Sequence, residues 1–325
     1  MRLRNRIKAR GTVLHTPTAQ MSFLFHPPAE AEPRMVVKKL GADLNAYRPD
    51  APSGPATNIF VRRIDCWHHT LALCKASVAP PARPSRKYVF DAAAARQRVC
   101  AHSSIEIFDE DAVDCALRLA AAGRDPLVLN LSDDDFAGGC VFSGSGAQEE
   151  SLFRRTNYCQ TLTQDMYPIR RAAEAIYSPG VSVLKRSEAD NWELVPETER
   201  ALLSFVACPA IKYPITVKVD GERRLNEDDA AALAQKIRLI VHIAAANGHD
   251  AIVLGAMGCG AWNNPARHVA QIFRAVLREL DGAVPLYAFA IMTTSNDNYI
   301  VRDARADRHS AFAAFSDVFA QPEEE

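Results

Sequence analysis

The sequence lacks several features that mark particular classes of protein. It contains no internal repeat, and no apolar run approaches the roughly 18 to 20 residues that a membrane-spanning helix needs. Its eight cysteines are scattered, with no Cys-x-x-Cys pair and no metal-type spacing. The net charge of −1 provides no bulk attraction to nucleic acid or to a membrane. We therefore expect a soluble protein with reduced cysteines, no zinc or other metal, and an intracellular location in cytoplasm or nucleus.

Charge is distributed unevenly along the chain. Residues 1–40 carry eight basic residues against two acidic ones, and no acidic residue precedes Glu30. We expect residues 1–55 to form a basic, flexible segment, residues 56–321 to form the folded domain with a helical extension at its start, and residues 322–325 to form an acidic tail. The basic segment could be an uncharacterised tail, an organellar transit peptide, or an arm that contacts a polyanion.

Apolar patterns alternate between short strands and amphipathic helices over most of the chain. Residues 125–132 and 285–292 are short buried runs, and a helix is predicted over 226–247 and over 309–319. Residues 151–162 also have a helical pattern. Strands that alternate with helices predict an α/β sandwich of three layers, α/β/α, with a mixed and largely parallel central sheet.

Two glycine-rich loops follow predicted strands. The first lies in FAGGCVFSGSGAQEES (136–151), and the second in GAMGCGA (255–261). In a parallel sheet, ligands bind where strands lead into helices, and glycine allows backbone N–H groups to converge on an anion. Two such loops favour a diphosphate gripped from both sides, although each could also be a plain connection. Neither loop is a P-loop, because no Gly-Lys-Ser/Thr follows.

Two adjacent carboxylates follow the first loop where a helix is predicted to begin. Neighbouring residues on a helix point in different directions, so Glu149 and Glu150 could serve different purposes. One could hold a sugar hydroxyl while the other acts on a glycosidic bond beside the diphosphate. The alternative is structural, because acidic residues are favoured in the first turn of any helix.

The order of these motifs resembles the poly(ADP-ribose) glycohydrolase family in its microbial branch. Gly138-Gly139-Cys140, seven residues and then Gln148-Glu149-Glu150 are similar to the family signature of three glycines before Gln-Glu-Glu. Four further segments resemble family segments in the same order along the chain, namely 62–75, 178–188, 254–265 and 289–291. The resemblance covers roughly residues 60–319 and implies a macrodomain-like fold.

The resemblance also implies roles for individual residues. Glu150 would be the catalytic acid that protonates the leaving ribose hydroxyl, and Glu149 would hydrogen-bond the ribose of the released unit. Gln148 would order the loop, and Asn130 would orient that ribose. The diphosphate would lie against Gly138, Gly139, Cys140, Gly258, Cys259, Gly260 and Ala261. Phe289 would stack near the adenine or its ribose.

By the same resemblance, the substrate would be poly(ADP-ribose) or an ADP-ribosylated protein. No cofactor, membrane contact or direct nucleic-acid binding is expected, and the protein is expected to be a monomer. Two departures from the family bear on activity: Cys140 stands where a third glycine is usual, and three aspartates, 133–135, precede the loop. The alternatives to polymer hydrolysis are a non-catalytic reader of ADP-ribose and a hydrolase of another ADP-ribosyl linkage.

Overall fold

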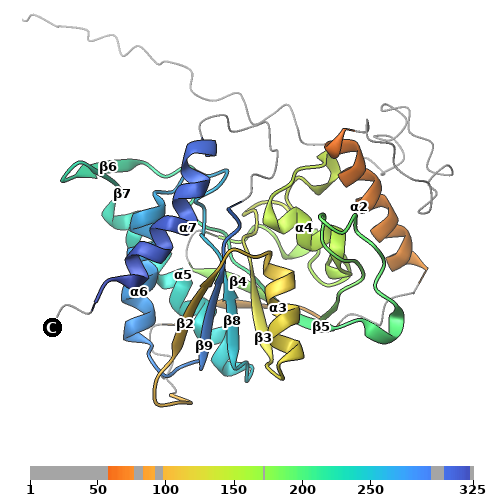
Figure 1. Cartoon of the computed structure of the whole chain (residues 1–325), viewed down its shortest axis with the longest axis horizontal. Helices are drawn as coiled ribbons and strands as arrows, with labels where there is room; N and C mark the ends of the chain where they lie inside the picture. The colour runs from red at the N-terminus through yellow and green to blue at the C-terminus, as the bar shows by residue number, and fades with distance from the viewer. Residues whose placement is uncertain (1–57, 77–82, 92–97, 171–172, 294–303, 323–325) are drawn as a thin grey trace, which may run out of the picture. The chain divides into compact units, whose positions relative to one another are not determined.

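A computed structural model describes residues 58–76, 83–91, 98–170, 173–293 and 304–322 (Figure 1). The predicted basic segment 1–55 and the last three residues of the predicted acidic tail lie outside the described residues. Among the helices of the described part, none is both long and apolar enough to cross a membrane.

A seven-stranded sheet forms the centre of the described domain. Its strand order is β1-β4-β5-β3-β8-β9-β2, and β4 runs antiparallel to both of its neighbours while the other pairs are parallel. The strands are β1 Arg86–Val89, β2 Ser104–Phe108, β3 Pro126–Asn130, β4 Glu174–Ser182, β5 Leu202–Ala207, β8 Ala251–Leu254 and β9 Leu286–Ala290. A separate hairpin consists of β6 Thr216–Val219 and β7 Glu222–Leu225.

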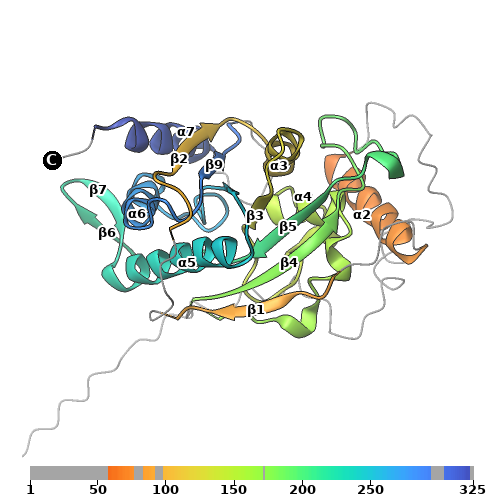
Figure 2. The same cartoon turned by 90° about the horizontal axis from the view of Figure 1, so that it is seen from below.

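Helices cover both faces of the sheet, as Figure 2 shows. Helices α5 (Glu227–Ala246), α6 (Ala266–Glu279) and α7 (Ala304–Ala320) pack over one face and share one apolar core with it. Helices α3 (Ala112–Ala121) and α4 (Gln148–Arg155) pack over the other face, around a second core. Helix α2 (Ile59–Lys75) packs against α4. The predicted three-layer α/β/α sandwich with a largely parallel sheet is therefore confirmed.

The central strands and the helix ends follow from local sequence. All five residues of β3 are buried, as expected for an apolar strand with neighbours on both sides and helices on both faces. Helix α5 begins after Asn226, whose side chain accepts a hydrogen bond from the Asp229 backbone N–H, and ends before Asn247-Gly248.

One predicted helix is shorter than its sequence pattern indicates. The pattern over 151–162 predicts a continuous helix, but α4 ends at Arg155. At Thr156 the backbone becomes extended and forms an isolated β-bridge with Val183. The Thr156 hydroxyl donates to the Leu152 carbonyl and accepts from the Tyr158 N–H, so side-chain hydrogen bonds replace those of the next helical turn. The chain continues as a short 3₁₀ turn, Tyr158–Gln160.

Candidate active site

Three neighbouring strands bring the predicted site residues to one edge of the sheet. Strands β5, β3 and β8 are adjacent and parallel, so the loops that follow them meet at their carboxyl ends. The side chain of Leu131, after β3, lies against Gly255, after β8. The Asn264 amide donates to the Ile211 carbonyl at 2.8 Å and thereby joins the loops after β8 and β5. The two glycine loops are therefore parts of one surface.

Glu149 is buried and its carboxylate is held by several donors. One oxygen accepts from the Asp133 N–H at 2.6 Å. The other accepts from the Gly138 N–H at 3.1 Å, from the Asn130 amide at 3.3 Å and, more weakly, from the Tyr167 hydroxyl at 3.5 Å. Hydrogen bonds of this kind favour the charged form of a carboxyl group.

Glu150 is also buried but has a different set of contacts. Its Oε1 accepts from the Cys140 N–H at 2.9 Å, and its own backbone N–H and the Ser145 side chain also act on the carboxyl group. Its Oε2 is buried and accepts no hydrogen bond of ordinary geometry within the described part of the chain. A buried oxygen without a donor is a poor place for negative charge and a good place for a proton. The two glutamates are therefore neighbours in the chain with different hydrogen-bond partners.

The pKa values of both carboxyl groups lie above their ordinary value. Burial, followed by repulsion from Glu150, raises the pKa of Glu149 well above the usual range. Burial also raises the pKa of Glu150, although the Cys140 N–H and the positive charge of Arg154 oppose that shift. Two carboxyl groups this close titrate as a pair, so the pair retains a proton at a pH where an exposed glutamate has lost it.

Gln148 and Asn130 connect α4 to the end of β3. The Gln148 side chain accepts from the Leu131 N–H at 2.9 Å and donates to the Leu129 carbonyl at 2.7 Å. It therefore orders the end of the strand and the start of the loop that follows. Asn130 is completely buried and donates to Glu149, while its own Oδ1 has no partner within the described part of the chain.

The first two glycines of the loop allow the backbone to pass directly over α4. A Cβ atom on Gly139 would lie 2.8 Å from Glu150 Oε1 and 3.1 Å from Glu149 Oε2, and the residue has a φ of +55°. A Cβ atom on Gly138 would lie 2.6 Å from the Phe153 ring. Only glycine adopts this backbone without strain at such a short distance from the two carboxylates.

The last two glycines allow α2 to approach the same loop. A Cβ atom on Gly144 would lie 2.4 Å from the Phe60 carbonyl oxygen, and one on Gly146 would lie 2.5 Å from the Arg63 guanidinium. Arg63 is buried and forms a bidentate pair with Glu188 at 2.8 and 2.9 Å. Helix α2, the helix predicted at the start of the domain, therefore packs directly against the first glycine loop. Sequence reasoning did not find this contact.

Cys140 fits the loop although it replaces a third glycine. Its φ of −101° is accessible to any residue, so a side chain there causes no backbone strain. The residue is exposed, and its backbone N–H is the donor to Glu150. Loss of hydration and then the charge of Glu150 raise the pKa of its thiol to about 11. The thiol is therefore protonated at neutral pH.

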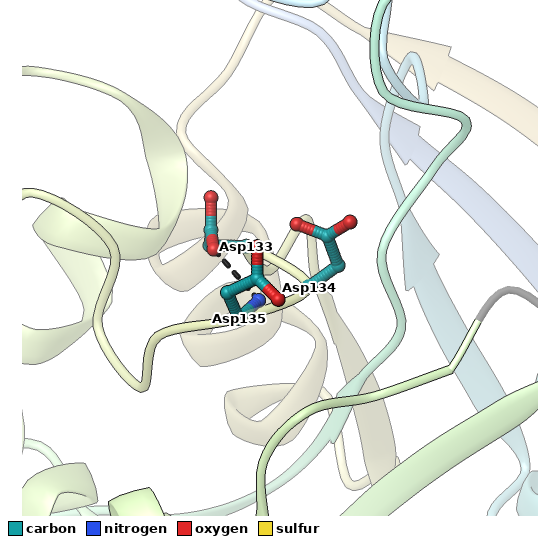
Figure 3. Close-up of side chains that lie close together, drawn as sticks. All are labelled: Asp133, Asp134 and Asp135. Atoms are coloured by element: carbon teal, nitrogen blue, oxygen red, sulfur yellow. Dashed lines mark hydrogen bonds between the residues drawn. The ribbon is translucent and has the colours of Figure 1, made fainter. Parts of the chain in front are cut away.

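The three aspartates before the loop share one lysine, which offsets part of their negative charge. The ammonium group of Lys212, which follows β5, lies 3.1 Å from Asp133, 2.7 Å from Asp134 and 3.7 Å from Asp135. Figure 3 shows the three carboxyl groups near one another, with the Asp135 N–H donating to the Asp133 carboxylate. Burial would lower the pKa of Lys212, but the aspartates outweigh it and raise that pKa above its usual value. This lysine was not predicted, although its place just after the strand next to β3 could have indicated it.

The second glycine loop has a more open structure. Gly258 packs against the buried Asn264, whereas a Cβ atom on Gly260 would meet no other atom within 4 Å. Ala261 is exposed, while the Cys259 side chain is buried and donates to the Met257 carbonyl. Only the backbone of Cys259 could therefore face a ligand.

A pocket of about 220 Å³ lies beside this second loop, and Trp262 lines it. The Lys212 ammonium lies 5.7 Å from the centre of the Trp262 ring. The remaining lining residues are Tyr213, Pro214, Thr216, Arg223 and Asn263. Neither glutamate borders the pocket, so it is separate from the carboxylate pair.

The prediction for Phe289 needs correction. Its ring is completely buried in β9 and is enclosed by three other phenylalanines, each with its ring centre 5.2 Å away: Phe273, Phe315 and Phe319. All three belong to helices α6 and α7, which pack on the sheet. A ring surrounded in this way has no face for an adenine, so Phe289 is a core residue. The apolar pattern of a buried strand was the signal for this role.

Comparison with known proteins places part of the chain beside a described family. Residues 68–186 match the family model described as "Microbial-type PARG, catalytic domain", where PARG is poly(ADP-ribose) glycohydrolase. This range contains the first glycine loop and both glutamates but not the second loop. The resemblance to the microbial-type family predicted from the motifs is therefore confirmed. No curated protein matches the sequence.

Solved structures of bacterial PARGs share the fold. PARG from Thermomonospora curvata is 23% identical with a TM-score of 0.60, and the match covers 79% of this chain and 99% of that one. The same protein bound to the inhibitor ADP-HPD is 23% identical with a TM-score of 0.57, covering 77% and 98%. PARG from Deinococcus radiodurans in complex with ADP-ribose is 21% identical with a TM-score of 0.57, covering 77% and 96%. At these identities, the structural similarity establishes a shared fold and nothing further.

Proposed function

We propose that this chain, which matches the microbial-type PARG catalytic domain over residues 68–186, hydrolyses ribose–ribose bonds in poly(ADP-ribose) and releases ADP-ribose. The fold shared with PARGs solved with ADP-ribose and with ADP-HPD supports this substrate class. The site supports the reaction type, because two carboxyl groups lie under a glycine loop at the ligand-binding edge of the sheet.

The observation that carries the proposal is the unequal hydrogen bonding of the two glutamates. Glu149 accepts two backbone N–H bonds and one from an amide, so it is the better carrier of negative charge. Glu150 accepts the Cys140 N–H bond, and its buried Oε2 accepts none of ordinary geometry within the described residues, so it is the better carrier of the shared proton. A general acid must hold a proton near neutral pH. Burial raises the pKa of both carboxyl groups, and that of Glu149 by more, so the choice of Glu150 rests on its hydrogen bonds and not on the size of the pKa shift.

In the proposed reaction, Glu150 donates its proton to the ribose oxygen that leaves. The bond from the anomeric carbon to that oxygen breaks through an oxocarbenium-like transition state. Water then adds to the anomeric carbon and returns a proton to the Glu150 carboxylate. The negative charge of Glu149 and that of the substrate diphosphate stabilise the developing positive charge.

The remaining site residues would position the substrate. Asn130 and Glu149 would hold hydroxyl groups of the ribose that is released. The open backbone at Gly260 and Ala261 would receive the diphosphate, with Gly258 and the Cys259 backbone beside it. Gly139 and the Cys140 N–H would act mainly on the glutamates, which is a different role from the diphosphate contact that the motif implied.

The experiment is incubation of the purified chain with labelled poly(ADP-ribose), followed by separation of the products. We expect the wild-type chain to release monomeric ADP-ribose and the Glu150→Gln variant to release none. Tight binding of ADP-ribose without any product, at high protein concentration, would identify a reader instead. A mono-ADP-ribosylated protein tested in parallel distinguishes the third alternative, because turnover of that substrate alone would identify a hydrolase of a protein linkage.

A further inference from the structure

Two thiols face each other at the back of the domain, between α2 and the segment after α4. Cys74 lies in the last turn of α2, and Cys159 lies in the 3₁₀ turn Tyr158–Gln160. Their sulfur atoms are 3.9 Å apart, with Cys159 donating to Cys74. Both are free thiols, separated by 85 positions along the chain. The pair has no part in the proposed hydrolysis.

The surroundings of the pair keep the two sulfur atoms together. The Gln160 amide, next to Cys159, donates to the Cys74 carbonyl at 3.1 Å and holds the turn against the helix end. Leu73 and Leu184 form a small apolar cluster with the two cysteines. A disulfide bond is about 2.05 Å long, so the sulfur atoms need to approach by somewhat less than 2 Å. Rotation of the side chains can supply much of that distance.

The two thiols also differ in reactivity. The hydrogen bond from Cys159 lowers the pKa of Cys74 more than burial raises it, and the positive charge of Lys185 adds to the lowering. The same contact raises the pKa of Cys159, together with burial. Cys74 is buried and Cys159 is half-exposed, so the contact favours a thiolate on Cys74 while Cys159 is the sulfur that solvent reaches more easily.

We infer that Cys74 and Cys159 form a reversible disulfide bond when the protein meets a peroxide. One of the two thiols, as its thiolate, attacks a peroxide oxygen, and with one proton taken up this gives a sulfenic acid and a molecule of water or alcohol. The sulfur of the other thiol, 3.9 Å away in the reduced protein, then attacks the sulfur of that sulfenic acid, loses its proton and releases water. Two thiols are oxidised by two electrons and one peroxide is reduced, and a dithiol reductant reverses the reaction.

The disulfide bond would link the end of α2 to the turn that follows α4, and both helices pack against the first glycine loop. Helix α2 contacts the loop through Phe60 and Arg63, and its Thr70 hydroxyl donates to the Arg154 carbonyl of α4 at 2.5 Å. Cys74 lies eleven residues beyond Arg63, or about 16 Å along the helix. Oxidation should therefore stabilise the domain without reaching the glutamates. From the large loop that it closes, we expect the melting temperature to rise by about 5 to 10 °C.

The test uses the full chain, first reduced and then treated with hydrogen peroxide. Peptide mapping without reductant should recover one cross-linked peptide containing Cys74 and Cys159, and the intact mass should fall by two hydrogens. Cys74→Ser and Cys159→Ser should each abolish the cross-link and the rise in melting temperature. Cys100→Ser is the control and should retain both, because the Cys100 thiol donates to the carbonyl oxygens of His102 and Gly282 and is not part of the pair.

Several outcomes would overturn the inference. One is peroxide treatment that leaves both thiols reduced or takes each separately to the sulfinic acid. Another is a cross-link to a different cysteine in the unsubstituted chain. Because the readouts are a covalent bond and a melting temperature, they stand whether or not the chain hydrolyses poly(ADP-ribose).

Discussion

In the first glycine loop, after β3, each of the four glycines lies close to a side chain or a carbonyl group of another segment. In the second loop, after β8, Gly260 has no such neighbour. In the first loop a Cβ atom would lie 2.4 to 2.8 Å from its nearest neighbour at every glycine. In the second loop only Gly258 has so close a neighbour, the Asn264 amide at 2.4 Å.

The difference separates two uses of glycine that look alike in a sequence. The first loop needs glycine because α2 and α4 pack against it, with the two glutamates directly beneath Gly139. The second loop has unfilled space at Gly260, where a ligand can approach the backbone. This difference supports the proposal that the first loop serves catalysis and the second binds an anion. The predictions below test this proposal, starting with the largest expected effect.

The largest effect is expected for Glu150→Gln. The glutamine oxygen can still accept from the Cys140 N–H, and its amide replaces Oε2, so the fold should be retained. Loss of the general acid should lower kcat by about 10²- to 10⁴-fold. ADP-ribose release measures the rate, and circular dichroism measures the fold. Glu227→Gln, at the exposed start of α5, is the control and should keep full activity.

Substituting one glycine in each loop compares them directly. Gly139→Ala places a methyl group against both carboxylates at a φ of +55°, so we expect a loss of about 1–3 kcal/mol in stability and a lower kcat. Gly260→Ala meets no protein atom and should change stability by less than about 0.5 kcal/mol, while weakening ADP-ribose binding. Thermal melting and calorimetric titration measure the two effects. If Gly260→Ala binds ADP-ribose normally, the second loop does not contact the ligand.

A smaller effect, on ADP-ribose affinity, is expected from replacing Lys212, which contacts the three aspartates. Lys212→Met leaves three aspartates without their cation, next to the proposed diphosphate site. We expect the Kd for ADP-ribose to rise about tenfold at low salt, equal to about 1.4 kcal/mol, and less at high salt because of screening. Lys218→Met, on the exposed strand β6, is the control. Adding Asp134→Asn to Lys212→Met should restore part of the affinity, and no recovery would contradict the electrostatic explanation.

The smallest effect concerns stability and pH. Because burial raises the pKa of Glu150, the folded protein binds that proton more strongly than the unfolded chain does. This contribution is complete below the unfolded value of about 4.3 and is lost as pH rises through the folded pKa. The Glu150→Gln variant has no such pH-dependent contribution, because its amide does not titrate. The difference in stability between variant and wild type should therefore move in favour of the variant as the pH rises from 4 to 8, as denaturant titrations at both pH values can measure. A constant difference across this range would contradict a raised pKa.

Much of the architecture could be predicted because it depends on local patterns. The buried strand β3, the capped helix α5 and the order of strands and helices follow from apolar periodicity and turn residues. The helix predicted over 151–162 was too long because Thr156 forms a bridge with Val183, a contact distant in sequence. Phe289 was misassigned for the same kind of reason, since helices α6 and α7 surround its ring.

The sequence by itself determined the α/β class, the two glycine loops at strand ends, and the adjacency of Glu149 and Glu150 at the start of a helix. These features depend on neighbours within a few residues, so the chain order expresses them directly. Only the tertiary structure showed which glutamate oxygen lacks a hydrogen bond of ordinary geometry and which lysine contacts the three aspartates. It also showed that the backbone at Cys140 accepts a side chain without strain. Those depend on burial and on contacts between segments far apart in the chain, because hydrogen bonding and the cost of charge are properties of the folded surroundings.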